Sequence, residues 1–221
     1  MKTILCYGDS NTHGTKAIDF DLLETSFISS HYRLPKFKRW TGILQNELGK
    51  DYNVIEEGLN GRTTVWDDPL EGTHKNGLKY LVPCLESHAP IDLVILMLGT
   101  NDLKIKFSVS AFDVAMGIGV IVNTIQKSGF GLDGTSPEVL ILCPPPLGRL
   151  SYLECLFGEE GIKKSKELSV HFKKIANLYG CSFLDVADII KPSDIDGAHY
   201  DEKDIEKLAK ALVKPVKDII G

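Results

Sequence analysis

The chain has 221 residues, of which 43% are hydrophobic, and its formal net charge is −5. A chain of this length can bury a substantial core, and we expect one domain over residues 1–221. The net negative charge argues against nucleic acid or an anionic membrane surface as a partner. Five cysteines without paired spacing favour reduced thiols and a cytoplasmic protein, and no apolar run approaches the roughly 18 residues that span a bilayer.

Taken in chain order, short apolar runs alternate with longer segments of helical periodicity. Strands are predicted at residues 3–7, 52–55, 93–98, 139–143 and 182–186. Amphipathic helices are predicted at residues 40–48, 111–125 and 168–179 and from Asp201 onward, with Pro215 expected to kink or end the last one. Irregular stretches at 15–32, 67–75 and 128–137 have lengths that often shape binding sites or subunit contacts. Strands separated by helices predict an α/β fold with a parallel sheet covered on both faces.

Two sequence blocks from opposite ends of the chain suggest a hydrolase. Gly8-Asp9-Ser10 follows the first predicted strand directly, and Asp196 and His199 lie three residues apart near the other end. A serine, a histidine and an aspartate can act as nucleophile, base and orienting group in acyl transfer. Each block is ambiguous alone, because Gly-Asp-Ser also forms ordinary turns and helix caps. Asp196 and His199 could also be a capping carboxylate with a surface histidine, or two ligands of a metal site for which no third ligand is evident.

Two further blocks can supply hydrogen-bond donors for the negative oxygen of a tetrahedral intermediate. Gly61 lies in a turn after the second predicted strand and can offer its backbone N–H to a substrate. Asn101 follows the third predicted strand within Gly99-Thr100-Asn101-Asp102, and its side-chain amide can donate from the same edge of the sheet. Together with the N–H of Ser10, these groups predict an oxyanion hole.

In this order, and over nearly the whole length, the four blocks resemble the SGNH hydrolases of the GDSL esterase/lipase family. The segments Glu56-Glu57-Gly58-Leu59, Arg62-Thr63-Thr64 and Leu98-Gly99-Thr100-Asn101-Asp102 are most similar to the arylesterase/acyltransferase branch. The resemblance implies a flavodoxin-like three-layer α/β/α sandwich around the five-stranded parallel sheet. It implies Ser10 as nucleophile, His199 as base, Asp196 as its orienting group, and Ser10, Gly61 and Asn101 as the oxyanion hole. It further implies no metal or organic cofactor, and a homo-oligomer.

The pocket entrance differs from the family pattern. Asn11 stands where family members more often carry a leucine, and His13 where the nearest branch tends to have a tryptophan, so we expect a more polar entrance. Asn11, Lys104 and Ala198 are expected to contact substrate, because each neighbours a residue of the predicted machinery. Residues 147–150 are expected to form a pocket wall, and Arg62 to steady the oxyanion turn.

The predicted function is that of a serine esterase acting on small carboxylic esters, with short acyl or aryl groups, through an acyl-enzyme on Ser10. Acyl transfer to another small nucleophile is a further activity of the same intermediate. The polar entrance motivates an alternative, a carbohydrate acetylesterase or another polar-ester deacetylase. A third hypothesis, a binding module that keeps the fold without chemistry, is disfavoured by the four intact blocks.

Overall fold

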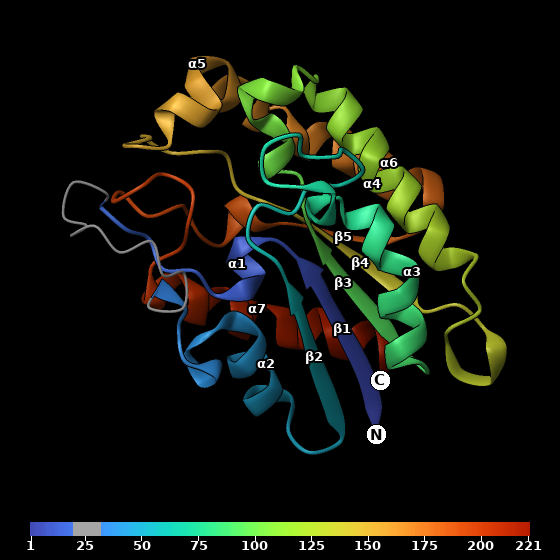
Figure 1. The fold of residues 1–221 in the computed structure, drawn as a ribbon. Helices are drawn as coiled ribbons and strands as arrows, with labels where there is room; N and C mark the ends of the chain where they lie inside the picture. Colours follow the sequence, from blue (N-terminus) through green and yellow to red (C-terminus); the bar gives the residue numbers. More distant parts are fainter. Residues whose placement is uncertain (20–31) are drawn as a thin grey trace.

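The computed structural model describes residues 1–19 and 32–221, and it is built on one five-stranded sheet. The strands are β1 (Lys2–Gly8), β2 (Tyr52–Gly58), β3 (Leu93–Met97), β4 (Glu138–Cys143) and β5 (Ser182–Asp185). All neighbouring pairs are parallel, and the order is β2-β1-β3-β4-β5 (Figure 1). This is the flavodoxin-like order, and the predicted fold class is confirmed. Because the order reverses between β1 and β3, the loops that follow these strands diverge and open a crevice at their carboxyl ends.

Helices cover both faces of the sheet (Figure 1). On one face lie α2 (Trp40–Leu48) and α7 (Glu202–Ile220), and on the other α3 (Gly77–His88), α4 (Ala111–Gln126) and α6 (Leu168–Tyr179). Successive residues of a strand point to opposite faces, so β1 contributes to both apolar layers. Leu5 and Tyr7 belong to the core cluster under α3, α4 and α6, whereas Ile4 and Cys6 belong to the cluster under α2 and α7. The sheet is therefore buried on both sides.

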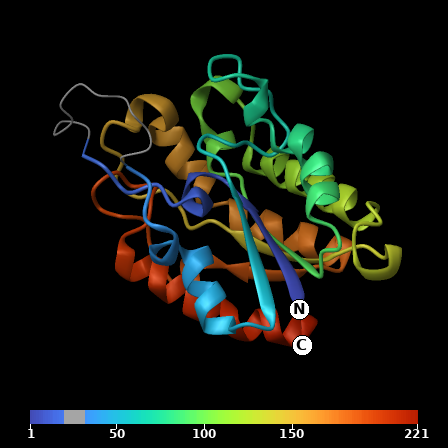
Figure 2. The same cartoon turned by 60° about the horizontal axis from the view of Figure 1, so that its bottom comes forward.

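Pro215 was expected to kink or end the last helix; helix α7 continues through it to Ile220, so the helix does not end there. A proline in a helix removes one backbone N–H donor and crowds the preceding turn. Here the apolar face outweighs that cost, because Leu212 and Val216, on either side of the proline, are fully buried. Helices α7 and α2 run side by side along the sheet (Figure 2).

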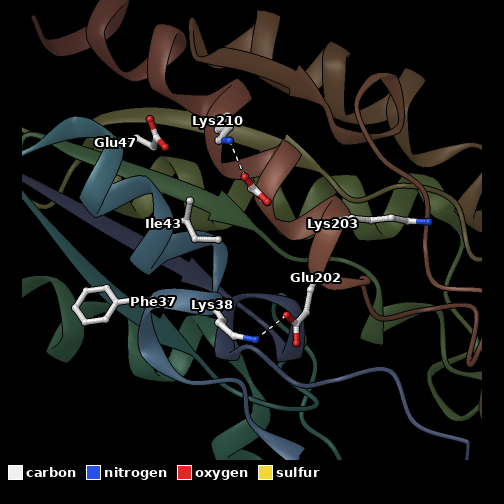
Figure 3. Close-up of a pocket in the computed structure, with 8 residues that line it drawn as sticks. Phe37, Lys38, Ile43, Glu47, Glu202, Lys203 and Lys210 are labelled. Carbon is white, nitrogen blue, oxygen red and sulfur yellow. Dashed lines mark hydrogen bonds and ion pairs between the residues drawn. The ribbon is translucent and has the colours of Figure 1, made fainter.

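A surface groove of about 540 Å³ lies between α2 and α7 (Figure 3). Ion pairs between Lys38 and Glu202 and between Lys210 and Glu206 lie along it. None of the candidate catalytic residues lines this groove, and four of its six charged residues belong to these two ion pairs. We interpret it as the solvent-exposed margin of the contact between two packed helices.

Two helices are not among those predicted with bounds, α3 and α5 (Glu154–Ser165). Each contains a residue type that interrupts helical patterns in a sequence. In α3 it is Pro83, and in α5 it is Gly158, whose φ is +58°. Helix α5 packs on the segment after β3, at the carboxyl edge of the sheet. Both chain ends lie at the opposite edge (Figures 1 and 2). Among the helices of the described ranges, none has the length and apolarity needed to cross a membrane.

Candidate active site

Ser10 is presented at the carboxyl edge of the sheet by a tight strand-to-helix turn. Strand β1 ends at Gly8, Asp9 caps the short helix α1 (Ser10–His13), and Ser10 is its first residue. A side chain at position 8 would not fit, because a Cβ there would lie 2.1 Å from Thr12 Oγ1. Asp9 Oδ1 accepts the backbone N–H of Asn11 at 3.0 Å, which fixes the turn. Burial raises the pKa of Asp9 to about 6, against the lowering effect of that hydrogen bond and of His199.

Ser10, His199 and Asp196 form a continuous hydrogen-bonded chain. His199 Nε2 lies 3.0 Å from Ser10 Oγ, and His199 Nδ1 lies 2.7 Å from Asp196 Oδ2. The other carboxylate oxygen of Asp196 accepts the backbone N–H groups of Ala198 at 3.0 Å and His199 at 2.9 Å. Burial alone would raise the pKa of Asp196, but the hydrogen bond and charge of His199 and these N–H groups hold it below its usual value. The carboxylate therefore stays ionised and holds the imidazole with Nε2 toward the serine.

The loop that carries the histidine is locked by close backbone contacts. Gly197 has φ of +75°, and a Cβ on it would lie 2.5 Å from Arg149 O. Its carbonyl accepts the N–H of Gly148 at 2.8 Å. Asn11 Nδ2 donates to Ala198 O at 3.2 Å, so helix α1 is tied directly to this loop. Asn11 and Ala198, both expected to contact substrate, thus connect the two halves of the candidate triad.

The candidate oxyanion donors come from three loops at the same edge. The N–H of Ser10 lies in the first turn of α1, where backbone N–H groups lack a helical acceptor. Gly61 follows β2 with φ of +74°, a conformation that favours glycine. Asn101 follows β3, and its Nδ2 donates to Arg62 O at 3.2 Å, which orients the amide. All three residues line one pocket together with His199.

Arg62 and Asp102 fix the relative positions of these loops through hydrogen bonds. Arg62 donates to Gly8 O at 3.0 Å and to Glu57 O, and its guanidinium lies 4.2 Å from the centre of the Tyr7 ring. It therefore steadies the oxyanion turn as expected. Asp102 is fully buried and accepts the N–H and the hydroxyl of Thr64.

The pocket around Ser10 has a volume of about 440 Å³. Its polar lining includes Asn11, Thr15, Asn60, Glu71, Thr100 and Lys104. Its large apolar side chains are those of Tyr152, Leu153, Leu156 and Phe157, from the segment that leads into α5 and from α5 itself, and Ala198 adds a small apolar surface. The expectation that residues 147–150 form the wall is wrong, because none of them lines this pocket; Leu147 and Leu150 pack in the core beneath it.

Several expectations for the site's surroundings also need revision. His13 does not line the pocket, and its Nδ1 lies 3.3 Å from Gly58 O, so of the two residues that differ from the family pattern Asn11 is the one in the pocket lining. Glu71 was not predicted, and it comes from the irregular segment 67–75. Most of the stretch 15–32 lies outside the described residues.

Glu57, Cys84 and His88 bring possible metal-ligand atoms within 4.8 Å of one another. None of the three lines the catalytic pocket. His88 Nε2 and Glu57 Oε1 are hydrogen-bonded at 2.9 Å, and burial raises the pKa of the Cys84 thiol to about 12. A protonated thiol beside a satisfied histidine–glutamate pair is the arrangement of a structural contact.

Comparison with known families gives the family of the chain. The model of the GDSL-like lipase/acylhydrolase family matches residues 6–205. The chain belongs to this family. The family assignment confirms the prediction of a carboxylic ester hydrolase. No curated protein matches the chain at a significant level.

Solved structures agree over the whole chain. An aryl esterase from M. smegmatis is 38% identical, with 99% of this chain and 100% of that chain covered and a TM-score of 0.90. A carbohydrate acetylesterase from Sinorhizobium meliloti is also 38% identical, with 99% of each chain covered and a TM-score of 0.89. A putative arylesterase from Agrobacterium tumefaciens is 33% identical, with coverage of 99% and 100% and a TM-score of 0.84. The resemblance stated from the sequence motifs is therefore confirmed.

Proposed function

We propose that the chain is a serine esterase that hydrolyses small carboxylic esters through an acyl-enzyme on Ser10. The hydrogen-bonded chain from Ser10 through His199 to Asp196 carries this proposal. His199 Nε2 takes the hydroxyl proton while Ser10 Oγ attacks the ester carbonyl carbon. The carbonyl oxygen becomes negative and is stabilised by the N–H groups of Ser10 and Gly61 and by the amide of Asn101.

Collapse of the tetrahedral intermediate completes the first half of the reaction. His199 gives its proton to the leaving alcohol oxygen, the carbon–oxygen bond breaks, and the acyl group remains on Ser10. Water then attacks the acyl-enzyme while His199 accepts a proton from it, and the acid is released with the Ser10 hydroxyl restored. An alcohol in place of water would give acyl transfer, and product analysis with added alcohol measures how the two routes divide.

Covalent labelling tests the proposed nucleophile. A serine-directed phosphonate should modify the wild-type protein once, at Ser10, and abolish hydrolysis of p-nitrophenyl acetate. Ser10→Ala should be neither labelled nor active. Ser87→Ala is a matched control, because Ser87 is exposed at the end of α3 and its hydroxyl donates to Pro83 O within the same helix. Label on another serine, or activity in Ser10→Ala, would reject the assignment.

The pocket supports a preference for short acyl groups. A volume of about 440 Å³ has to hold both sides of the ester, and its apolar wall is confined to the side chains from Tyr152 to Phe157. We expect kcat/KM to fall steadily along the p-nitrophenyl esters from acetate to octanoate. A maximum at long chains would reject the small-pocket interpretation.

The polar side of the pocket favours a second candidate, deacetylation of a carbohydrate or another polar ester. Asn11, Asn60 and Lys104 present hydrogen-bonding groups around Ser10. The similar structure from S. meliloti is named a carbohydrate acetylesterase. Comparing acetylated sugars with aryl acetates separates the two candidates, and inactivity on all acetylated sugars would remove the second.

We also propose that the protein forms a homo-oligomer and works in the cytoplasm. Phe112, Met116 and Val120 form an exposed apolar stripe at a spacing of four along α4, which supports contact with another copy. Light scattering that shows a monomer at micromolar concentration would contradict the first proposal. The five cysteines are free, and three are buried, which supports a reducing compartment. Cell fractionation tests the second.

A further inference from the structure

Glu71 is held beside the Gly61 turn by a hydrogen-bonded turn that begins at Asp68. Asp68 Oδ1 accepts the N–H groups of Leu70 and Glu71, each at 2.9 Å, and Asp68 O accepts the N–H of Gly72 at 3.1 Å. The carboxylate of Glu71 then lies directly against Gly61, since a Cβ on Gly61 would be 2.6 Å from Glu71 Oε2. An acid is therefore fixed on the pocket wall next to a candidate oxyanion donor.

Lys104 faces this carboxylate from the loop after β3. Its side chain is only 6% exposed, it lines the catalytic pocket, and its Nζ donates to Glu71 Oε1 at 2.9 Å. An ammonium group has three N–H donors. In the described part of the chain, Glu71 is the acceptor assigned to this group, so further donors remain for a molecule in the pocket. Leaving a buried charged donor without an acceptor costs free energy that a bound polar group can recover.

The local charges favour a neutral polar guest. Of the five charged groups clustered here, Lys75, Lys106 and Asp68 do not line the pocket, so a guest meets one ammonium, of Lys104, and one carboxylate, of Glu71. Burial would raise the pKa of Glu71, but the hydrogen bond and charge of Lys104 hold it below its usual value, so it accepts hydrogen bonds at neutral pH. A carboxylate on the substrate would be repelled by Glu71. A hydroxyl both donates and accepts, and thus fits a donor and an acceptor side by side.

We propose that the Lys104–Glu71 pair selects esters that carry a free hydroxyl close to the ester group, with Lys104 donating to the hydroxyl oxygen and Glu71 accepting its hydrogen. This inference rests on the proposed esterase function and names its substrate class. An ester with a plain hydrocarbon at that position leaves both groups unsatisfied, and a site built to bond a hydroxyl discriminates strongly against such an analogue.

The experiment compares matched esters with and without the hydroxyl. Glycerol monoacetate against propyl acetate tests a hydroxyl on the alcohol side, and ethyl glycolate against ethyl acetate tests one on the acyl side. The measured quantity is the ratio of kcat/KM within each pair. The wild-type ratio should favour the hydroxylated ester in at least one pair, and the arm that responds identifies which side of the substrate meets Lys104.

Two variants and a control make the test decisive. Lys104→Met keeps the length of the side chain and should lower the ratio by about tenfold or more, the loss that follows removal of one charged hydrogen bond. Glu71→Gln, at a half-exposed position, should lower the same ratio and serves if Lys104→Met fails to fold. Lys79→Met should keep the wild-type ratio, because Lys79 pairs with Asp67 on the surface away from the pocket.

A wild-type enzyme without preference in either pair, or variants that keep the wild-type ratio, would overturn the proposal. An equal fall on both members of each pair would also overturn it, because the pair would then act on the machinery and not on selectivity. Failure of the esterase function itself is recognised separately, by absence of phosphonate labelling at Ser10 and of hydrolysis of p-nitrophenyl acetate.

Discussion

Replacing Asp196 with asparagine isolates the electrostatic part of the triad. In the structure one carboxylate oxygen accepts two backbone N–H groups, from Ala198 and His199, and the other accepts His199 Nδ1. An asparagine oxygen can keep the two backbone bonds, which places its NH₂ group toward Nδ1. Two donors cannot face each other, so the proton of the imidazole moves to Nε2. His199 then presents a donor to Ser10 Oγ and cannot act as its base.

The expected loss follows from this change of tautomer. In triads of the same geometry the aspartate-to-asparagine change lowers kcat by about 10⁴. At about 1.4 kcal/mol for each tenfold change, this corresponds to roughly 5 kcal/mol of transition-state stabilisation. Stability should change less, because the two shorter backbone hydrogen bonds of residue 196 are kept and a buried charge is removed; only the 3.4 Å bond from the Ile18 N–H to Oδ2 is lost.

The assay is hydrolysis of p-nitrophenyl acetate under saturating conditions, with thermal unfolding as the check on folding. Asp194→Asn is a matched control two residues away, since Asp194 is exposed and its ion pair is with Lys191. It should keep wild-type activity. Folded Asp196→Asn protein that retains more than about a tenth of wild-type kcat would refute the tautomer argument.

Three other changes have defined outcomes. Gly61→Ala should lower stability by about 1 kcal/mol or more, seen in urea unfolding, because φ is +74° and the new Cβ meets Glu71; unchanged stability would contradict it. Asn101→Ala should lower kcat by about 10²–10³ with little change in KM, because a donor to the oxyanion is lost; steady-state kinetics decide. Burial raises the pKa of Asp102 from 3.8 to about 6, so its ionisation destabilises only the folded state. As the pH rises from about 4 to about 7, the free energy of unfolding should therefore fall, by on the order of 1–3 kcal/mol for this group. The fall should be smaller in Asp102→Asn, which has no carboxyl group at this position.

The parts of the fold that the sequence predicts are those with local causes. Residues 93–97 form a continuous apolar run, and a strand buried on both faces needs such a run. Ser10 and Asn101 come directly after strands, so parallel pairing alone brings them to one edge. The loop geometry at Gly61 and Gly197 is equally local, because both adopt positive φ.

The parts that were missed depend on long-range contacts or on exceptions to local rules. Glu71 meets Lys104 across 33 residues, and nothing in the segment 67–75 signals that contact. The pocket wall from Tyr152 to Phe157 is decided by where α5 packs. Pro215 breaks a local rule, and the buried apolar face of α7 overrides it.

The Ser10–His199 hydrogen bond spans 189 residues of sequence. Ser10 lies directly after the first strand, and His199 lies just before the last helix. The candidate oxyanion donors come from the segments that follow β1, β2 and β3. No partial assembly of the sheet can hold all of these groups at once. Turnover is thus a readout of complete folding, and during refolding, catalytic activity should return only with the final native topology, after helical signals have largely recovered.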